Sequence, residues 1–160
     1  MGMKIKTGTF NDEEIYSRHR DELMRFSRVL VGPDQAADVL SSVIVRILSK
    51  RHLSDLDDAR PYLYRAVLNE ARSFQRKRVH LNGLVPDSIP ANPVPSADPE
   101  VLSAVGALPP RQRAAIFLVY WEGYTPTEAA DLMHARPGTV RRYLHLARQH
   151  LKGVLNDSAA

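Results

Sequence analysis

The chain has 160 residues, of which 44% are hydrophobic, carries a formal net charge of +4 and contains no cysteine. Without cysteine it has no disulfide bonds, and the six histidines are scattered rather than paired at ligand spacing, so we predict neither a metal site nor a cofactor. No apolar run approaches the roughly 20 residues that cross a bilayer, and no apolar segment follows the basic N-terminus. We therefore predict a cytoplasmic protein without membrane insertion.

Charge is distributed unevenly along the chain. Lys and Arg outnumber Asp and Glu in residues 1–78 and again in residues 108–160, whereas residues 79–107 contain three acidic residues and no basic one. Two basic blocks on either side of an acidic spacer favour a polyanionic partner that contacts both ends of the chain.

The first half of the chain begins with two predicted helices. Asn11 followed by three acidic residues is typical of a helix N-terminus, and Gly32 is placed to end that helix. Its expected apolar stripe is Ile15, His19, Leu23, Phe26 and Leu30. A second helix is expected from Pro33 to about Arg51, and the short connection favours antiparallel packing of the two. Its expected buried stripe is Leu40, Val43, Ile44, Ile47 and Leu48.

A loop is expected over residues 50–61, and a third helix with two distinct faces over about residues 60–78. The inner face is Leu63, Val67, Ala71 and Phe74. The second face, at helical spacing, is Tyr62, Arg65, Asn69, Arg72 and Arg76. An aromatic ring followed by Arg and Asn at this spacing can stack on unpaired bases and hold a phosphate backbone. The alternative is that Tyr62 and Tyr64 are half-buried packing residues and that the arginines are solvated.

Residues 79–99 contain five of the eleven prolines and no Lys or Arg, and they show no sustained hydrophobic period. Because proline fixes φ and disfavours helix, we predict an extended, semi-stiff linker there. The sequence thus predicts an all-α protein of two small helical domains, a three-helix domain over residues 10–78 and a helix-turn-helix domain over residues 100–156, joined by the proline-rich linker.

The second domain is expected to begin with a short amphipathic segment that carries Val101, Leu102, Val105 and Leu108. Pro109-Pro110 then opens a helix that ends at Glu122-Gly123. Trp121 is the only tryptophan, and we expect it in the core or in an interface rather than in a ligand site.

Residues 125–152 have the pattern of a helix-turn-helix. Thr125-Pro126-Thr127-Glu128 has the form of a capping box with proline at the first helical position, so a short helix begins there. The chain breaks over residues 134–138, and a second helix follows from Pro137 to about Leu151. Its apolar face is Val140, Leu144, Ala147 and Leu151.

The other side of this second helix is basic and rich in hydrogen-bonding groups, and no acidic residue occurs from residue 132 to residue 156. Its members include Arg136, Thr139, Arg141, Arg142, Tyr143, His145 and Arg148. A short helix, a tight turn and a second helix with such an outer face form the arrangement whose second helix enters the DNA major groove. The alternative is a solvated basic helix end, but the turn, the cap and the one-sided charge occur together.

A family resemblance spans about residues 15–155. The segments LPPRQRAAIFLVYWEGYTPTEAADLM and RPGTVRRYLHLARQHLK resemble the C-terminal promoter-binding domain of bacterial sigma-70 family factors of the extracytoplasmic-function (ECF) type. DQAADVLSSVIVRIL resembles their RNA polymerase docking helix, and ARPYLYRAVLNEARSFQRKR resembles the helix that melts and reads the downstream promoter element. The resemblance implies a transcription initiation factor, not an enzyme. Its partners would be RNA polymerase core (clamp and flap) and promoter DNA, and an anti-sigma factor is a further partner that such proteins can have.

The resemblance implies a role for each set of residues. The upstream (minus-35) element would face Arg136, Thr139, Arg141, Arg142, Tyr143, His145 and Arg148. The downstream (minus-10) element would contact Tyr62, Arg65, Asn69, Arg72 and Arg76. The loop over residues 50–59, which in relatives forms a pocket for a flipped base, would assist them. RNA polymerase core would meet Asp38, Val39, Ser42 and Arg46.

Three positions depart from the family pattern. Ser41-Ser42 stand where relatives usually have Gln followed by an acid, which removes a negative charge from the expected docking face. His134 stands where the turn usually has Gly, and it must either tolerate the backbone of that turn or shift it. Arg136 stands where Ser or Thr usually caps the recognition helix, and because its side chain cannot accept the capping hydrogen bond we expect a loss on the order of 1 kcal/mol.

Two other functions fit parts of the sequence. A stand-alone helix-turn-helix regulator that acts without polymerase core would account for residues 108–152, but not for the arginine-rich face of the third helix. A catalytic site would have to use Asp55, Asp57 and Asp58. Adjacent acids before a helix are usually caps, and no His, Cys or Gly-rich phosphate loop accompanies them.

Overall fold

The structure is a computed structural model that describes residues 10–82 and 99–158. Within those residues every regular element is helical and no strand occurs, which confirms the predicted all-α class. Within the same two ranges, no helix is both long enough and apolar enough to span a membrane.

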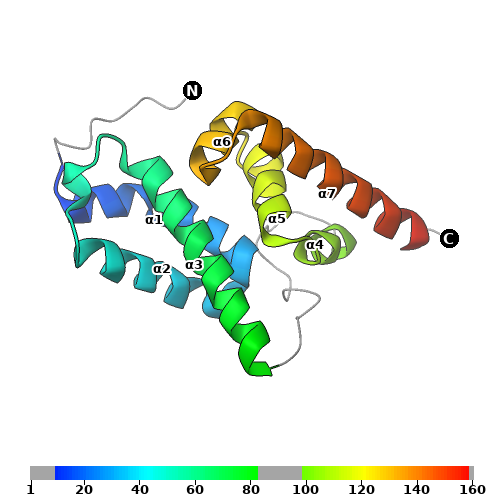
Figure 1. Ribbon diagram of the computed structural model, residues 1–160, viewed down its shortest axis with the longest axis horizontal. Helices are drawn as coiled ribbons and strands as arrows, with labels where there is room; N and C mark the ends of the chain where they lie inside the picture. Colours follow the sequence, from blue (N-terminus) through cyan, green and yellow to red (C-terminus); the bar gives the residue numbers. More distant parts are fainter. Residues whose placement is uncertain (1–9, 83–98, 159–160) are drawn as a thin grey trace.

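Helices α1 (Asp12–Val31) and α2 (Pro33–Leu48) pack against each other as a hairpin around Gly32 (Figure 1). The predicted cap of α1 is present: Asn11 Oδ1 accepts from the Glu14 amide at 2.8 Å, and the Glu14 carboxylate accepts from the Asn11 amide at 3.2 Å. Gly32 has a φ of 87°, in the region that side chains disfavour, which explains why glycine joins the two helices. The second helix ends at Leu48, earlier than the predicted Arg51.

His19 and Leu48 are the two positions where the predicted apolar stripes differ from the structure. The imidazole Nδ1 of His19 lies 2.8 Å from Glu22 Oε1, so this ring serves a polar contact rather than the core. Leu48 is 44% exposed at the end of α2. The other stripe residues are buried or pack against the core: Ile15, Leu23, Phe26, Leu30, Leu40, Val43, Ile44 and Ile47.

A 3₁₀ turn, η2 (Leu53–Asp55), leads into the long helix α3 (Ala59–Asn82). This helix continues past the predicted end at Arg78 because residues 79–82 contain neither Gly nor Pro, so the start of the predicted linker is helical. Residues 83–98, the rest of that linker except Pro99, lie outside the described residues. Along α3 the buried side chains include Leu63, Tyr64, Val67, Leu68 and Ala71, with Phe74 packed against them.

The second half comprises α4 (Pro99–Gly106), α5 (Pro110–Ile116), a π-helical turn η3 (Phe117–Trp121), α6 (Pro126–Met133) and α7 (Pro137–Ser158). The sequence predicted one uninterrupted helix where α5 and η3 stand. Its last turn widens instead, and the Glu122 amide donates to the Phe117 carbonyl at 3.0 Å. Such turns admit one extra residue and occur often at functional sites.

The two predicted halves pack against each other. In Figure 1, α5 lies beside α1 and α6 lies beside α3. The ring of Phe26 on α1 lies 4.9 Å from the ring of Tyr64 and 6.2 Å from that of Phe117, measured between centroids, so aromatic contacts run from one half into the other. The buried side chains form one continuous cluster.

The turn between α6 and α7 contains His134 in the left-handed conformation, with φ 54° and ψ 48°. Among the described residues it is the only non-glycine residue with positive φ. The sequence-based expectation that this residue must tolerate a glycine-type backbone is therefore confirmed. Its amide donates to the Asp131 carbonyl at 3.3 Å, which helps to close α6.

Replacing His134 by glycine is expected to raise the free energy of unfolding by about 0.5–1 kcal/mol. A left-handed L-residue costs roughly 1–2 kcal/mol, and the larger entropy of glycine in the unfolded chain offsets part of that gain. Thermal unfolding should show a rise in Tm of about 2–4 °C per kcal/mol. As a control, His150→Gly on the exposed side of α7 should lower stability by a few tenths of a kcal/mol. A loss of stability in both variants would contradict the strain at His134.

Candidate nucleic-acid interface

The helix-turn-helix is formed by α6 and α7. Its first helix begins at the predicted capping box, in which Thr125 Oγ1 accepts from the Glu128 amide at 3.1 Å and the Glu128 carboxylate accepts from the Thr125 amide at 3.2 Å. The bond from the Thr125 amide favours the ionised form of the Glu128 carboxylate and lowers its pKa. Val140, Leu144 and Ala147 are buried, and they fix which side of α7 faces the solvent.

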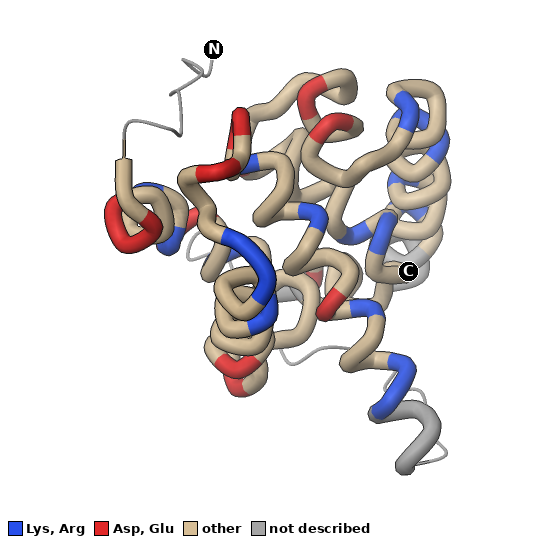
Figure 2. The backbone as a smooth tube through the Cα atoms, turned by 60° about the vertical axis from the view of Figure 1, so that its left-hand side comes forward, with Lys and Arg blue, Asp and Glu red and all other residues tan. Residues whose placement is uncertain are grey.

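The predicted minus-35 residues lie mostly on that solvent side. The exposed members are Arg136, Arg141, Arg142, His145 and Arg148, and the half-buried members are Thr139 and Tyr143. Figure 2 shows Lys and Arg residues distributed along both α3 and α7. Arg136 stands at the N-cap position, since its carbonyl accepts from the Val140 amide at 3.1 Å.

Two of these side chains are held by residues that the sequence analysis did not single out. Arg148 donates to the hydroxyl of Tyr120 at 2.8 Å, and Tyr143 accepts from Arg111 at 3.2 Å. Tyr120 belongs to the π-helical turn and is 56% exposed. Only the packing of α5 and η3 beside α7 brings these pairs together, so no spacing along the sequence could have indicated them.

The residues of the predicted minus-10 face of α3 lie along two edges of the helix, one beside α2 and the other beside the second half of the chain. Tyr62 and Asn69 line a groove of about 190 Å³ between α3 and α2, together with Val43, Arg46, Ile47, Lys50 and Ala66. The guanidinium carbon of Arg51 lies 5.5 Å from the centroid of the Tyr62 ring. An aromatic face, an amide and several cations in one groove suit an unpaired base with its phosphate.

The other edge of the face points toward the second half of the chain. Arg65 donates to the backbone carbonyl of Asp131 at 3.2 Å and to its carboxylate at 3.4 Å. Burial, with Arg111 and Arg76 close by, lowers the pKa of Arg72. Arg76 is exposed. The five residues therefore share one helix face, but they do not all face open solvent.

One of the predicted polymerase-docking residues is buried and does not lie on the surface. Val39 is 3% exposed and belongs to the core, because α2 directs it to the same side as Leu40 and Val43. Asp38 and Ser42 are exposed, and Val45, one turn further along, is 70% exposed. The exposed Arg46 is bound to Glu70 of α3 at 2.7 Å.

The acidic residues before α3 act as structural acceptors. The Asp55 carboxylate accepts from the His52 amide and the Asp58 carboxylate accepts from the Arg60 amide, both at 3.2 Å. Among the described residues, no group of three or more His, Cys, Asp or Glu residues could hold a metal ion. The structure therefore gives these carboxylates a role in ordering the loop before α3.

The same loop is tied to the start of α1. His52 Nδ1 lies 2.8 Å from one oxygen of the Asp12 carboxylate, and the other oxygen accepts from the Ser54 amide at 3.2 Å. The hydrogen bond to Asp12 raises the pKa of His52, and the same bond lowers the pKa of Asp12. This ion pair stabilises the folded loop where the histidine is protonated and the aspartate is ionised.

The contribution of this ion pair should depend on pH with a defined sign. The His52 part is present below the usual pKa of 6.5 and is lost as pH rises through the raised value, while the Asp12 part is present above 3.8 and is lost as pH falls through the lowered value. An NMR titration should give His52 a pKa above 6.5, and Asp12→Asn should return it toward 6.5. The neighbouring Glu13→Gln should leave it raised. An unchanged His52 titration in Asp12→Asn would contradict the pairing.

The fold and this pair of basic helices define a class of protein: an all-helical protein with a C-terminal helix-turn-helix whose outer side is basic. Residues 99–151 match the family described as Sigma-70, region 4. The chain is 24% identical over 156 residues to the ECF RNA polymerase sigma factor SigE of Mycolicibacterium smegmatis. That match covers 89% of the chain and 61% of the relative.

Solved structures share the fold. The sigma factor RpoE of Bartonella quintana, in complex with the anti-sigma factor NepR, superimposes with a TM-score of 0.71 at 21% identity, covering 90% of this chain and 96% of that one. CnrH in complex with the cytosolic domain of CnrY has a TM-score of 0.62 at 21% identity, covering 94% and 93%. Residues 99–151 thus match the sigma-70 region 4 family, and the chain is similar in sequence and fold to sigma factors of the ECF type.

Proposed function

We propose that this protein is a transcription initiation factor that binds RNA polymerase core and directs it to specific promoters. The observation that carries the proposal is the exposed basic side of α7 within a sigma-70 region 4 domain, joined to a first half that completes the sigma-factor fold. The stand-alone regulator explains the helix-turn-helix, but it gives no role to the groove between α2 and α3.

In this proposal α7 reads the minus-35 element. Arg141 and Arg142 are exposed on α7, and within the described residues neither forms an ion pair or a side-chain hydrogen bond. Arginine is well suited to contact guanine edges in the major groove, and phosphate contacts from the rest of the helix set its orientation. The region around Arg136 at the start of α7 lies where a recognition helix contacts base edges.

The first half handles the minus-10 element. The groove lined by Tyr62 and Asn69 accepts an unpaired base, and Lys50, Arg46 and Arg51 supply positive charge beside it. Stacking on an aromatic ring does not depend on base pairing, so binding there stabilises the separated strand. Residues 79–99 connect this half to the minus-35 reader.

The exposed side of α2 is the proposed docking surface for RNA polymerase core. Asp38, Ser42 and Val45 form a row at helical spacing, and Val45 is a large apolar side chain that the core of this protein does not use. Val39 is not part of this surface, because its side chain is buried. The sigma factor RpoE is seen in complex with the anti-sigma factor NepR, and CnrH is seen in complex with the cytosolic domain of CnrY. We propose that this chain likewise has an anti-sigma partner.

A reconstituted transcription assay tests the function. Purified protein is added to RNA polymerase core with a pool of genomic fragments, and the expected result is promoter-dependent run-off transcripts that are absent with core alone. Val45→Asp should abolish these transcripts and co-elution with core in size-exclusion chromatography. Glu13→Gln, an exposed change elsewhere on the first half, should preserve both. Sequence-specific DNA binding by the protein alone, without transcripts from any fragment, would instead support the stand-alone regulator.

A further inference from the structure

Two hydrogen bonds between an arginine and a tyrosine join α7 to the segment formed by α5 and η3. The Arg148 guanidinium on α7 donates to the hydroxyl of Tyr120 at 2.8 Å, and the Arg111 guanidinium on α5 donates to the hydroxyl of Tyr143 at 3.2 Å. Both arginines are exposed. Among the described residues, neither guanidinium has another hydrogen bond or an ion pair, so each is held by one hydroxyl alone.

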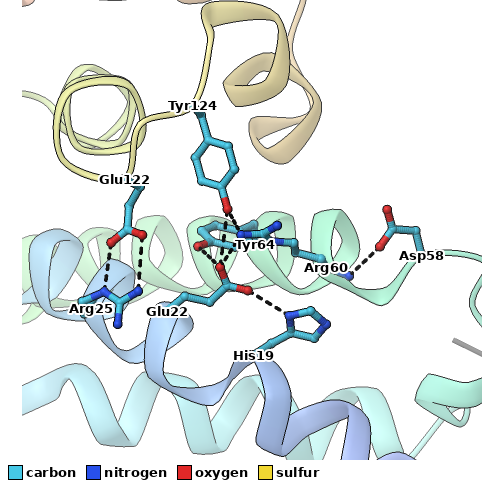
Figure 3. A network of polar contacts seen from close by, with 8 residues as sticks. All are labelled: His19, Glu22, Arg25, Asp58, Arg60, Tyr64, Glu122 and Tyr124. Carbon is cyan, nitrogen blue, oxygen red and sulfur yellow. Dashed lines mark hydrogen bonds and ion pairs between the residues drawn. The ribbon is translucent and has the colours of Figure 1, made fainter. Parts of the chain in front are cut away.

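The partner of each of these two arginines is a neutral hydroxyl rather than a carboxylate. Other arginines of the chain are paired with acids, and Figure 3 shows one of them, Arg25, bound to the Glu122 carboxylate at 2.9 Å. A carboxylate compensates the positive charge of the guanidinium, whereas a hydroxyl restricts its orientation and leaves the charge intact. The two hydroxyl-held arginines are therefore oriented cations that remain available to an anion.

The two pairs lie along opposite edges of the outer side of α7. Tyr143 and Arg148 project about 140° apart around the helix, at about 100° per residue. The buried side of the helix, which carries Leu144, fills the shorter arc between them, and the exposed Arg142 lies on the wider arc. Because Arg111 is bound to Tyr143, the outer side of α7 is bordered by one oriented cation along each edge.

This arrangement matches the walls of a DNA major groove. The groove is about 12 Å wide and an α-helix is about 10–12 Å across, so a helix seated in the groove has a sugar-phosphate backbone along each edge. The N-terminal residues of such a helix reach the base edges. Arg148 lies about 17 Å along α7 from Pro137, at about 1.5 Å per residue, which places it beyond the width of the groove and beside a backbone. Arg111 belongs to α5 and reaches the opposite edge of α7 through Tyr143.

The edge at Arg111 carries further positive charge that no acid compensates. Burial lowers the pKa of Arg72 on α3, and the positive charges of Arg111 and Arg76 lower it further, so three guanidinium groups lie near one another. Among the described residues, Arg72 and Arg76 form no ion pair and no side-chain hydrogen bond. Like charges gathered in this way favour a polyanionic partner at this edge.

From these contacts we propose that Arg111 and Arg148 are two phosphate anchors, each oriented by a tyrosine hydroxyl, that hold the two backbones of a DNA duplex on either side of α7. Tyr120 and Tyr143 are the positioning residues, because a guanidinium ordered before binding loses less entropy when it contacts a phosphate. The anchors set affinity and orientation, while the exposed arginines nearer the start of α7 read the bases. The inference rests on the proposed role of α7 as the minus-35 reader, and it adds Arg111 and Tyr120, which lie outside the helix-turn-helix, to that site.

Binding of the full chain to a duplex of mixed sequence tests the anchors without polymerase or promoter. A fluorescein-labelled duplex of about 20 base pairs is titrated between about 50 and 200 mM salt. Arg111→Ala and Arg148→Ala should each weaken binding about five- to tenfold and lower the slope of log affinity against log salt by about one, because each removes one phosphate contact. Arg28→Ala removes the same charge from an exposed position of α1, and it should change affinity by less than about twofold.

The positioning role of the tyrosines is tested by removing one oxygen atom from each. Tyr120→Phe and Tyr143→Phe keep the ring and should weaken duplex binding about two- to fourfold, because the guanidinium must then be ordered on binding. In the Arg148→Ala background, Tyr120→Phe should have no further effect, since its hydroxyl acts through that arginine. Tyr16→Phe on α1 is the matched control and should bind as the wild type does. The phenylalanine variants also keep the test valid if an alanine variant fails to fold.

Holoenzyme binding to a promoter separates the anchors from the base readers. Arg111→Ala should weaken binding to the promoter and to unrelated DNA by the same factor, whereas loss of a base reader reduces the ratio of the two affinities. A wild type that binds no duplex, or anchor variants whose salt slopes equal that of Arg28→Ala, would overturn the phosphate contacts. Additive losses from Tyr120→Phe and Arg148→Ala would overturn the positioning role. Absence of run-off transcripts would overturn the proposed function alone, because duplex binding requires no polymerase.

Discussion

Arg113→Ala is expected to lower the free energy of unfolding by about 3–5 kcal/mol, the largest stability effect that we expect from one substitution in this protein. Arg113 is 4% exposed. Its Nη1 donates to the carbonyls of Val29 and Leu30 at 3.2 and 2.8 Å, and its Nη2 donates to those of Gly106 and Leu108 at 3.0 and 2.7 Å. One guanidinium thus satisfies carbonyls in both halves.

The physical reason lies in what alanine would leave behind. The carbonyls of Val29 and Leu30 belong to the last turn of α1, where no helical amide is available to them and the helix dipole favours a cation. Burial lowers the pKa of Arg113 to about 10, so the side chain remains protonated at neutral pH. Its truncation would remove the donor from the carbonyls of Val29, Gly106 and Leu108, at a cost of about 1–3 kcal/mol for each buried acceptor, whereas the Leu30 carbonyl keeps a bond from Gln75 Nε2 at 3.0 Å.

Urea unfolding followed by circular dichroism measures the loss of unfolding free energy. In thermal unfolding, Tm should fall by about 10 °C, at 2–4 °C per kcal/mol. Arg111→Ala is the matched control, because Arg111 lies on the same helix but is exposed, and among the described residues it donates only to the Tyr143 hydroxyl. It should cost less than about 1 kcal/mol. Equal losses in the two variants would show that the four carbonyl bonds of Arg113 contribute little.

The double variant Arg141→Ala and Arg142→Ala is expected to weaken binding of holoenzyme to a promoter, found in the run-off assay, by about 100-fold. Each arginine that contacts a base edge contributes about 1–3 kcal/mol of discrimination, and 1.4 kcal/mol corresponds to a tenfold change in affinity. The fold itself should not change, because both side chains are exposed. Competition between the promoter and unrelated DNA measures the effect.

Salt dependence separates the two kinds of contact made by these arginines. Loss of a phosphate contact lowers the slope of log affinity against log salt by about one, whereas loss of a base contact reduces discrimination between sequences. Arg20→Ala with Arg28→Ala removes the same charge from exposed positions of α1, and it should change promoter affinity by less than about threefold. If that control pair weakens binding as much as the α7 pair, α7 is not the reader.

Local patterns in the sequence predicted the helix starts well. The capping boxes at Asn11 and Thr125 form as expected, because a cap depends only on residues three positions apart. The left-handed turn at His134 was expected only from the family resemblance, because relatives usually have Gly at that position. Apolar spacing likewise identified most of the core. Helix α3 extends beyond its predicted end because residues 79–82 contain no Gly or Pro.

Helix faces are harder to assign, because spacing shows which residues share a side but not what that side contacts. Val39 was predicted to dock on RNA polymerase core, but its side chain is buried. Tyr64 is also buried, and its own hydroxyl donates to the Glu22 carboxylate. Burial and the neighbouring carboxylate of Glu22 raise the pKa of that hydroxyl. The π-helical turn is also invisible in the sequence, since its widened bond pattern follows no residue preference that we could read.

By itself the sequence determined that this protein is all helical, where most of its helices begin, and which residues of α3 and α7 carry the charge that suits DNA, because caps and helical periods are local properties. Only the tertiary structure decided that Arg113 spans the two halves, that Glu22 and Tyr124 meet across them, and that Arg65 is engaged by α6. Contacts between residues far apart in sequence depend on how helices dock, and side chains from three elements converge there without any shared pattern.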